Sequence, residues 1–288
     1  MTAFLNKGYY PTGDGHHLYW ERHGTPGSEP IFFLHGGPGG RCTPHHLEFF
    51  DLRCFDIIVF DQRGCGRSHP LGELHHNNTG LSIEDIDALR RHFGFGKISL
   101  LGVSWGSWLA IQYQQRYPEA VLKTTLVSVF VPFPANVSAY DKTLSEGLSE
   151  ITNGSSVRGI YQILSRGCEV QQRQAAIHWL RVNLQLNGQS MGLPALEDFV
   201  NEEAVRSIRL ELHYHVNHYF FRRADESLSV DANTVVIQGI TDTFGMSSVR
   251  WLRQRQNIRC RLLHAGHNAF DLPILKAVQQ SLKRESDR

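Results

Sequence analysis

Short hydrophobic runs recur along the chain, and most of them are continuous rather than alternating with polar residues. They occupy residues 17–23, 31–35, 56–61, 97–103, 122–131, 233–240 and 258–264. Continuous apolar runs of this length are typical of strands that are covered on both faces, as in a parallel sheet. The pattern therefore predicts strands at these positions, most of them parallel.

Segments with helical spacing lie between these runs. The clearest is SIEDIDALRRHFG, in which Ser82 is the expected N-cap and Gly94 the expected C-cap. A second, WGSWLAIQYQQRYP, predicts an amphipathic helix that ends at Pro118. Because strands and helices alternate, the sequence predicts an α/β fold.

The alternation stops at residue 132 and resumes at residue 233. The sequence in between is mainly helical, most clearly in AAIHWLRVNLQL and NEEAVRSIRLELHYHVNHYFFR, with a break at TNGSS. An insertion between two strands predicts a helical cap over one end of the sheet. We therefore expect a core of residues 1–131 and 233–288 and a helical cap of residues 132–232.

Charge and composition exclude several classes of partner. The 288 residues include 29 Lys and Arg against 28 Asp and Glu, so the formal charge is +1. Such a balance gives no electrostatic reason to expect nucleic acid or an anionic membrane as a partner. The basic cluster RWLRQRQNIRCR is interpreted as a solvated helix face and a strand flank.

Neither the cysteines nor the histidines predict a metal site. The five cysteines, at positions 42, 54, 65, 168 and 260, have no CxxC spacing, so neither a disulfide framework nor a zinc site is expected. Adjacent histidines do not share a face of a helix or strand, which makes the pairs 16/17, 45/46 and 75/76 poor ligand sets.

The N-terminal sequence MTAFLNKGYYPTGDG lacks the apolar segment of a signal peptide. No run approaches the ~18 apolar residues that a membrane-spanning helix needs. Together with the unpaired cysteines, this predicts a soluble, cytoplasmic protein.

The candidate nucleophile is Ser104, in the stretch GVSWG. It stands between a predicted strand and a predicted helix, which is the context that a G-x-S-x-G motif requires. Gly102 and Gly106 lack side chains because the tight turn brings the strand and helix backbones together, and the helix N-terminus favours developing negative charge. The alternative is that Ser104 only caps the helix.

A serine nucleophile needs a general base, and the base needs a carboxylate to orient it. In α/β-hydrolases these residues follow the serine in the order Asp, His, each in a loop after a later strand. Asp242 and His267 match both the order and the placement. His264 is the rival base, but it falls at the end of a strand, where a structural role is expected.

The glycine-rich stretch FLHGGPGG, residues 33–40, directly follows a predicted strand. Its glycines allow backbone N–H groups to approach a substrate oxygen, and the amide of Trp105 supplies a second donor. The two together predict an oxyanion hole. A plain Gly/Pro turn is the alternative interpretation of this stretch.

These residues resemble those of the proline iminopeptidase (prolyl aminopeptidase) family of α/β-hydrolase serine peptidases. The resemblance runs through LYWERHG, FLHGGPGG, VFDQRGCGRS, NNT, GVSWGSWLAIQYQQRYP, GITD and AGHNAF. It implies an α/β-hydrolase fold, a mostly parallel sheet flanked by helices, and no cofactor. It also implies a triad of Ser104, Asp242 and His267, with oxyanion donors at Gly37 and Trp105.

The sequence of the predicted cap resembles the family less closely than that of the core does. By resemblance, Phe130 and Phe220 line the pocket for the proline ring. Family members carry one glutamate immediately before NHYF and another in a W-x-x-W-E stretch, and both hold the substrate's α-ammonium group. Here these positions are Val216 and Asn183, and Gly245 replaces a pocket cysteine.

These departures bear on the substrate, because a buried ammonium group needs a paired charge. Without either glutamate the site is ill-suited to a free N-terminus. Glu202, Glu203 or Glu211 could compensate from a neighbouring turn, but each is expected on an exposed helix face.

The leading hypothesis is a serine hydrolase of the proline iminopeptidase type. It would cleave a small amide or ester, or a short peptide, through an acyl-enzyme on Ser104, with a Phe-lined pocket for a proline-like or other apolar acyl group. True prolyl aminopeptidase activity is the close alternative. An acyltransferase and a non-catalytic ligand-binding hydrolase fold are the others.

Overall fold

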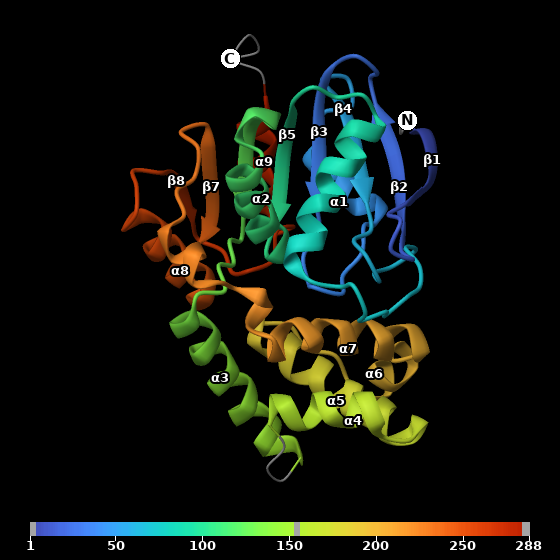
Figure 1. Ribbon diagram of the computed structural model, residues 1–288. Helices are drawn as coiled ribbons and strands as arrows, with labels where there is room; N and C mark the ends of the chain where they lie inside the picture. Colours follow the sequence, from blue (N-terminus) through green and yellow to red (C-terminus); the bar gives the residue numbers. More distant parts are fainter. Residues whose placement is uncertain (1–3, 153–155, 284–288) are drawn as a thin grey trace.

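The computed structural model of the protein describes residues 4–152 and 156–283. Eight strands form one sheet in the order β1-β2-β4-β3-β5-β6-β7-β8 (Figure 1). Strands β3 to β8 run parallel to one another, whereas β2 is antiparallel to both of its neighbours, β1 and β4. Their bounds are β1 Phe4–Pro11, β2 His17–Gly24, β3 Glu29–Leu34, β4 Phe55–Phe60, β5 Ile98–Val103, β6 Val121–Val127, β7 Thr234–Gly239 and β8 Arg259–Leu263.

The seven predicted strands correspond to β2 through β8. The run over 122–131 is shorter than predicted, because Ser128 has a φ of 48° and turns the chain out of the sheet after Val127. Strand β1 was not predicted. Most of its residues are exposed at the sheet edge, so its sequence FLNKGYYP carries no continuous apolar run.

Helices cover both faces of the sheet, as the continuous apolar runs require. Helices α1 (Thr79–His92), α2 (Trp105–Arg116) and α8 (Thr243–Arg253) pack on one face, and α9 (Leu272–Leu282) packs on the other. Neighbouring residues of one strand enter opposite clusters, as Leu100 and Leu101 do. The α/β-hydrolase architecture predicted from the sequence is thereby confirmed.

The start of helix α1 corrects a prediction. Its N-cap is Asn78, whose side chain accepts a hydrogen bond from Leu81 N, so Ser82 lies inside the first turn and is not the cap. The Ser82 hydroxyl instead donates to the carbonyl of Asn78. The predicted C-cap is off by one residue. The C-cap is Phe93, and Gly94 follows it with a φ of 71°, a left-handed position that glycine favours.

A mainly helical insertion separates β6 from β7. It contains α3 (Pro134–Thr152), α4 (Val157–Arg166), α5 (Glu169–Leu186), α6 (Leu193–Phe199) and α7 (Glu202–Val216). Short 3₁₀ turns η3 (His218–Phe220) and η4 (Arg223–Ser227) follow, and η1 (Pro44–Phe49) and η2 (Pro118–Ala120) lie elsewhere in the chain. Residues 153–155 of the predicted break fall outside the described residues.

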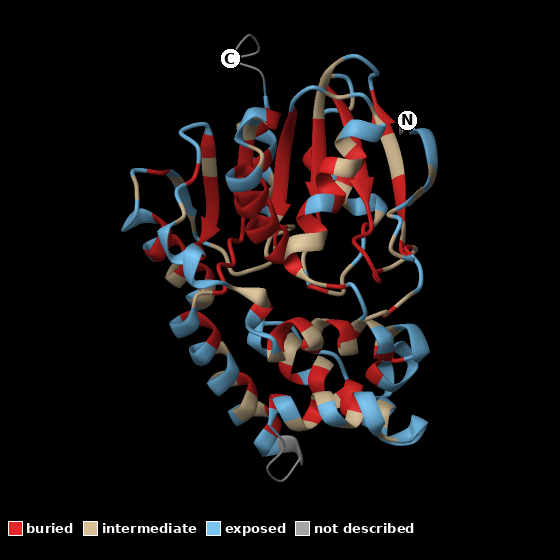
Figure 2. Cartoon of the chain, in the orientation of Figure 1, coloured by how far each residue is buried: buried red, intermediate tan, exposed pale blue. Residues whose placement is uncertain are grey.

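Figure 1 shows these helices gathered beyond one end of the sheet, with α7 nearest to it. They bury an apolar cluster of their own, including Leu144, Trp179 and Leu212, and their outward surface is largely exposed (Figure 2). A Cβ atom at Gly39 would lie 2.5 Å from the carbonyl oxygen of Ser207, so the glycine-rich loop touches the α7 backbone directly. We propose that residues 132–232 act as a cap over the sheet.

None of the helices in the described part of the chain is long and apolar enough to cross a membrane.

Candidate active site

Ser104 occupies a sharp turn between β5 and α2. Its φ of 53° and ψ of −120° are strained for a serine. Glycine is required at both flanking positions, because a side chain there would collide with backbone atoms. A Cβ atom at Gly102 would lie 2.4 Å from the carbonyl oxygen of Gly106, and one at Gly106 would lie 2.0 Å from that of Leu34. The turn therefore holds the serine side chain clear of both elements.

The structure brings Ser104, His267 and Asp242 into one chain of hydrogen bonds. His267 Nε2 lies 2.9 Å from Ser104 Oγ, and His267 Nδ1 lies 2.6 Å from Asp242 Oδ2. The carboxylate is held in turn by the Gln238 side chain, which donates to Oδ2 at 2.8 Å, and by the Gly245 amide, which donates to Oδ1 at 2.9 Å. This is the arrangement that a serine nucleophile, a general base and an orienting carboxylate require.

Electrostatics fix the roles of these groups. Burial alone would raise the pKa of Asp242, but hydrogen bonds from His267, Gly245 and Gln238 outweigh it and lower the pKa below its usual value. An ionised carboxylate only accepts hydrogen bonds, so His267 Nδ1 carries a proton. In the neutral imidazole, Nε2 is then free to accept the Ser104 hydroxyl proton.

The glycine-rich loop lies against Ser104. A Cβ atom at Gly36 would lie 3.3 Å from Ser104 Cβ, and Gly37 lines the same cavity as Ser104. Trp105 is the first residue of α2, where backbone N–H groups have no partner within the helix. The loop and the helix N-terminus thus face Ser104 from two sides.

Gln62 joins these two sides. Its side-chain Nε2 donates to the carbonyl of His35 at 2.9 Å, and its Oε1 accepts the indole N–H of Trp105 at 3.0 Å. Its backbone amide donates to His35 Nε2 at 3.0 Å. Gln62 is buried, so both side-chain bonds are shielded from water.

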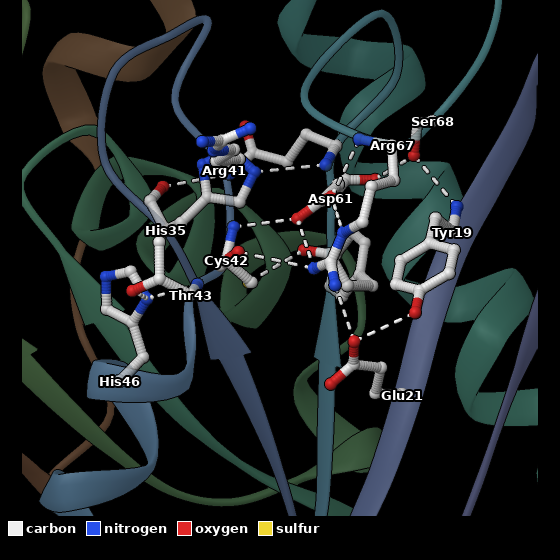
Figure 3. Close-up of polar contacts among 12 residues, drawn as sticks. Tyr19, Glu21, His35, Arg41, Cys42, Thr43, His46, Asp61, Arg67 and Ser68 are labelled. Atoms are coloured by element: carbon white, nitrogen blue, oxygen red, sulfur yellow. Dashed lines mark hydrogen bonds and ion pairs between the residues drawn. The ribbon is translucent and has the colours of Figure 1, made fainter.

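The preceding residue, Asp61, fixes the segment that follows the glycine-rich loop (Figure 3). This fully buried carboxylate accepts hydrogen bonds from the Cys42 amide at 2.7 Å and from the Arg67 amide and Nε at 2.9 and 2.8 Å. The Arg67 guanidinium also stacks 4.0 Å from the centroid of Tyr19 and pairs with Glu21. The DQRGCGRS stretch therefore ties the loop to strands β2 and β4.

A cavity of about 430 Å³ opens onto Ser104 and His267. The core contributes Gly37, Phe130, Phe244 and the turns around Asp242 and Gly266, and the helical insertion contributes Tyr140, Asn183, residues 185–188, Glu211 and Tyr219. The cavity is therefore walled by the core on one side and by the helical insertion on the other.

The chain matches known hydrolases over most of its length. A family model described as the alpha/beta hydrolase fold matches residues 29–156. The proline iminopeptidase of Neisseria gonorrhoeae is 29% identical, covering 97% of this chain and 96% of its own. That of Xylella fastidiosa (strain Temecula1) is 30% identical, covering 94% of this chain and 93% of its own.

The chain therefore belongs to the proline iminopeptidase family. It is a hydrolase of the prolyl aminopeptidase-like type. The crystal structure of a proline iminopeptidase-related protein from Thermus thermophilus shares the fold, with a TM-score of 0.65 and 22% identity, and covers 96% of each chain.

Glu211 lies where the sequence analysis did not expect it. The prediction that it lies on an exposed helix face is wrong, because it lines the cavity. Its Oε2 accepts the Trp179 indole N–H at 3.1 Å, and no Lys or Arg pairs with it among the described residues. Burial raises the pKa of Glu211 to about 7, opposed only in part by that hydrogen bond.

The other two glutamates are exposed, as predicted. Glu202 pairs with Arg206 and Glu203 with Arg41 at the surface. Helical spacing carried a signal that distinguished Glu211, which stands three residues after the buried Ile208 and four before the buried His215. These positions share one face of α7.

Of the five positions expected to bind substrate in this proline iminopeptidase relative, two line the cavity. They are Phe130 and Asn183. The Asn183 side chain is held at both ends, since its Oδ1 accepts from Tyr140 Oη at 3.0 Å and its Nδ2 donates to the Trp179 carbonyl at 3.1 Å.

Two of the other positions lie outside the cavity lining. Phe220 is not among the cavity-lining residues, and its ring packs 5.3 Å from that of Tyr214, because a left-handed turn presents Tyr219 to the cavity instead. Val216 is also outside the lining, since it ends α7 away from the face that carries Glu211.

Gly245 does not line the cavity either. A Cβ atom at this position would lie 2.2 Å from Asp242 Oδ2 and 2.3 Å from Gln238 Nε2, so there is no room for a side chain. Its amide serves the carboxylate, and the preceding residue, Phe244, lines the cavity.

Among residues 4–152 and 156–283 no cluster of three or more His, Cys, Asp or Glu side chains has the arrangement of a metal site.

Proposed function

We propose that the protein releases N-terminal proline from short peptides and prolyl amides through an acyl-enzyme on Ser104, with Glu211 binding the substrate's α-ammonium group. The observation that carries the proposal is a partly buried carboxylate without a cationic partner in the cavity that holds Ser104 and His267. It favours the aminopeptidase over the alternative that accepts neutral acyl groups.

Acylation follows from the geometry of the triad. His267 Nε2, 2.9 Å from Ser104 Oγ, takes the hydroxyl proton as the oxygen attacks the substrate carbonyl. The resulting oxyanion accepts hydrogen bonds from the amides of Gly37 and Trp105. The imidazolium then gives its proton to the departing amine, and the C–N bond breaks to leave the prolyl ester of Ser104.

Deacylation repeats these steps with water. His267 takes a proton from the water as its oxygen attacks the ester, and it returns the proton to Ser104 Oγ as proline leaves. Asp242 stays ionised throughout and stabilises the imidazolium in each half-reaction, which agrees with its lowered pKa.

The acyl group is surrounded by aromatic rings. Phe130, Tyr140, Tyr219 and Phe244 all line the cavity, and the ring centroids of Tyr140 and Phe244 are 4.9 Å apart. Burial of the three ring methylenes of proline against such a surface contributes about 2 kcal/mol to binding. A compact, apolar ring is suited to this space.

Glu211 supplies the charge that Val216 and Asn183 lack. A partly buried carboxylate with one hydrogen bond is poorly stabilised, which is why desolvation raises the pKa of Glu211 to about 7. An incoming ammonium group stabilises the ionised form and gains a charge-assisted hydrogen bond in return. A neutral N-acyl group would leave the carboxylate without a cation.

The sign of the pH dependence follows. As pH falls through about 7, Glu211 of the free enzyme takes up a proton and its attraction for an ammonium group is lost. As pH rises above about 8, the substrate amine loses its proton. The preference for a free over a blocked N-terminus should therefore be greatest between about pH 7 and about pH 8. In Glu211→Gln, the fall of this preference below about pH 7 should be absent.

The test compares prolyl-naphthylamide with its N-acetyl form. We expect the wild type to prefer the free amine, and Glu211→Gln to lower kcat/KM for it by about 10- to 100-fold. The same variant should change hydrolysis of p-nitrophenyl acetate by less than about threefold, because that ester carries no cation. Glu203→Gln, an exposed glutamate of the same helix, is the matched control and should behave as the wild type.

Comparable cleavage of the free and N-acetyl substrates by the wild type would contradict the proposal. It would restore the hypothesis of a hydrolase for neutral acyl groups.

A further inference from the structure

The chain after helix α7 makes an unusual turn. His218, Tyr219 and Phe220 have φ values of 50°, 53° and 54°. Three consecutive non-glycine residues in the left-handed region cost about 1–2 kcal/mol each. Such a turn persists only where its surroundings hold it, and strain of this kind gathers at functional sites.

The turn is held at its centre, Tyr219. The Thr79 hydroxyl at the start of α1 donates to the Tyr219 carbonyl at 2.6 Å. The neighbouring Phe220 ring packs against Tyr214 and His213 instead of the cavity. The left-handed turn thus directs the side chain of Tyr219, and not that of Phe220, into the cavity.

The Tyr219 ring touches both parts of the catalytic core that receive the acyl group. Its centroid is 5.7 Å from the ring of Trp105, the residue after the nucleophile, and 5.0 Å from that of Phe130. It is almost fully buried and lines the cavity. It therefore fills the space between the serine turn and the acyl pocket.

The Tyr219 hydroxyl is fixed by a second pair of residues. His215, the penultimate residue of α7, has Nδ1 3.1 Å from this hydroxyl and Nε2 3.3 Å from Asp141 Oδ1. The hydrogen bond from His215 lowers the pKa of Asp141, so its carboxylate accepts from Nε2–H. In the neutral imidazole, Nδ1 then accepts from Tyr219, whose own pKa burial raises well above its usual value.

We propose that Tyr219 sets the upper size limit of the acyl group, and that His215, oriented by Asp141, positions its ring. Tyr219 is the specificity-determining residue and contacts substrate, whereas His215 is a positioning residue that acts through the tyrosine hydroxyl. The inference rests on the proposed acyl-enzyme at Ser104, but it requires no amine on the substrate.

The test uses p-nitrophenyl esters from acetate to hexanoate. Tyr219→Ala should raise the kcat/KM ratio of hexanoate to acetate by about tenfold or more, because it opens space beside Phe130. Tyr219→Leu, which keeps more of the volume, should give an intermediate ratio and serves if the alanine variant does not fold. An unchanged ratio in a folded variant would overturn the proposal.

The positioning role is tested by a double-mutant cycle of Tyr219→Phe and His215→Leu. Each removes the same hydrogen bond, so each should raise KM for butyrate by about three- to tenfold, with a smaller change in kcat, and the double variant should be no worse than either. His178→Leu, on α5 outside the cavity lining, is the control and should match the wild type. Additive effects would refute the positioning role.

The ester series also separates this inference from the proposed activity. If esters respond as expected while prolyl amides are not cleaved, the aminopeptidase assignment fails and the role of Tyr219 stands. If prolyl amides are cleaved but the ester ratio is unchanged by substitution of Tyr219, the aminopeptidase assignment stands and the role of Tyr219 fails.

Discussion

The two walls of the cavity are built in different ways. On the core wall, Ser104, Gly37 and His267 sit in turns at the ends of parallel strands, where backbone contacts leave little freedom. A Cβ atom at Gly102 or Gly106 would collide with backbone oxygen. On the other wall, Glu211 and Asn183 project from the helices α7 and α5, where a neighbouring position can present a similar group.

This difference separates the chemistry from the choice of substrate. The core wall must hold atoms within hydrogen-bond distance of one another through the reaction, so its residues and their spacing are fixed together. The insertion wall needs only a carboxylate within reach of an ammonium group. Under the proposed function, Glu211 can therefore supply the charge that Val216 and Asn183 lack while Ser104, His267 and Asp242 keep their positions.

The largest effect should come from the core wall at Ser104. Ser104→Ala removes the nucleophile, so we expect ester and prolyl-amide hydrolysis to fall by about four orders of magnitude or more. A fluorophosphonate probe should label the wild type stoichiometrically and the variant not at all. Labelling of the Ser104→Ala variant would place the nucleophile at another residue. It would contradict the assignment of the chemistry to the core wall.

Asp242→Asn should have the next largest effect. The amide cannot hold His267 in the tautomer that leaves Nε2 free, so kcat should fall by about three to four orders of magnitude with little change in KM. Steady-state kinetics with p-nitrophenyl acetate measure both constants. A raised KM with an ordinary kcat would assign Asp242 to substrate binding.

The same contrast explains what the sequence could predict. Seven strands, the serine turn and the order Ser, Asp, His are visible because each depends on local spacing or on glycines required by backbone contact. Strand β1 was missed because an exposed edge strand carries no apolar run. The boundary of β6 depended on the positive φ of Ser128, which no sequence pattern marks.

The insertion wall was predicted least well, for a related reason. Resemblance placed Phe220 in the cavity, but the left-handed turn substitutes Tyr219, and backbone strain leaves no pattern in the sequence. Glu211 was taken for a solvated residue because it is charged, although its spacing from Ile208 and His215 pointed inward. Which helix face meets the cavity depends on how the insertion packs on the core.

A smaller effect is expected where one residue links the two sides of the predicted oxyanion hole. Gln62→Leu removes both the bond to the His35 carbonyl and the bond to the Trp105 indole. We expect kcat to fall by about tenfold and KM to change by less than about twofold, because the two donors lose their common support. Thermal unfolding provides the control. A lower Tm with an unchanged kcat would make Gln62 structural only.

The smallest effect is expected at Val216, although resemblance makes it the site of a lost glutamate. Val216 lies outside the cavity lining, whereas Glu211 lies within it, so a carboxylate at position 216 has no path to the bound ammonium group. Val216→Glu should change the preference for prolyl-naphthylamide over its N-acetyl form by less than about threefold, measured as a ratio of kcat/KM values. Combined with Glu211→Gln, it should not restore the preference. A double variant that regains selectivity for the free amine would show that α7 can present its charge from either position, and the two walls would then differ less than their construction suggests.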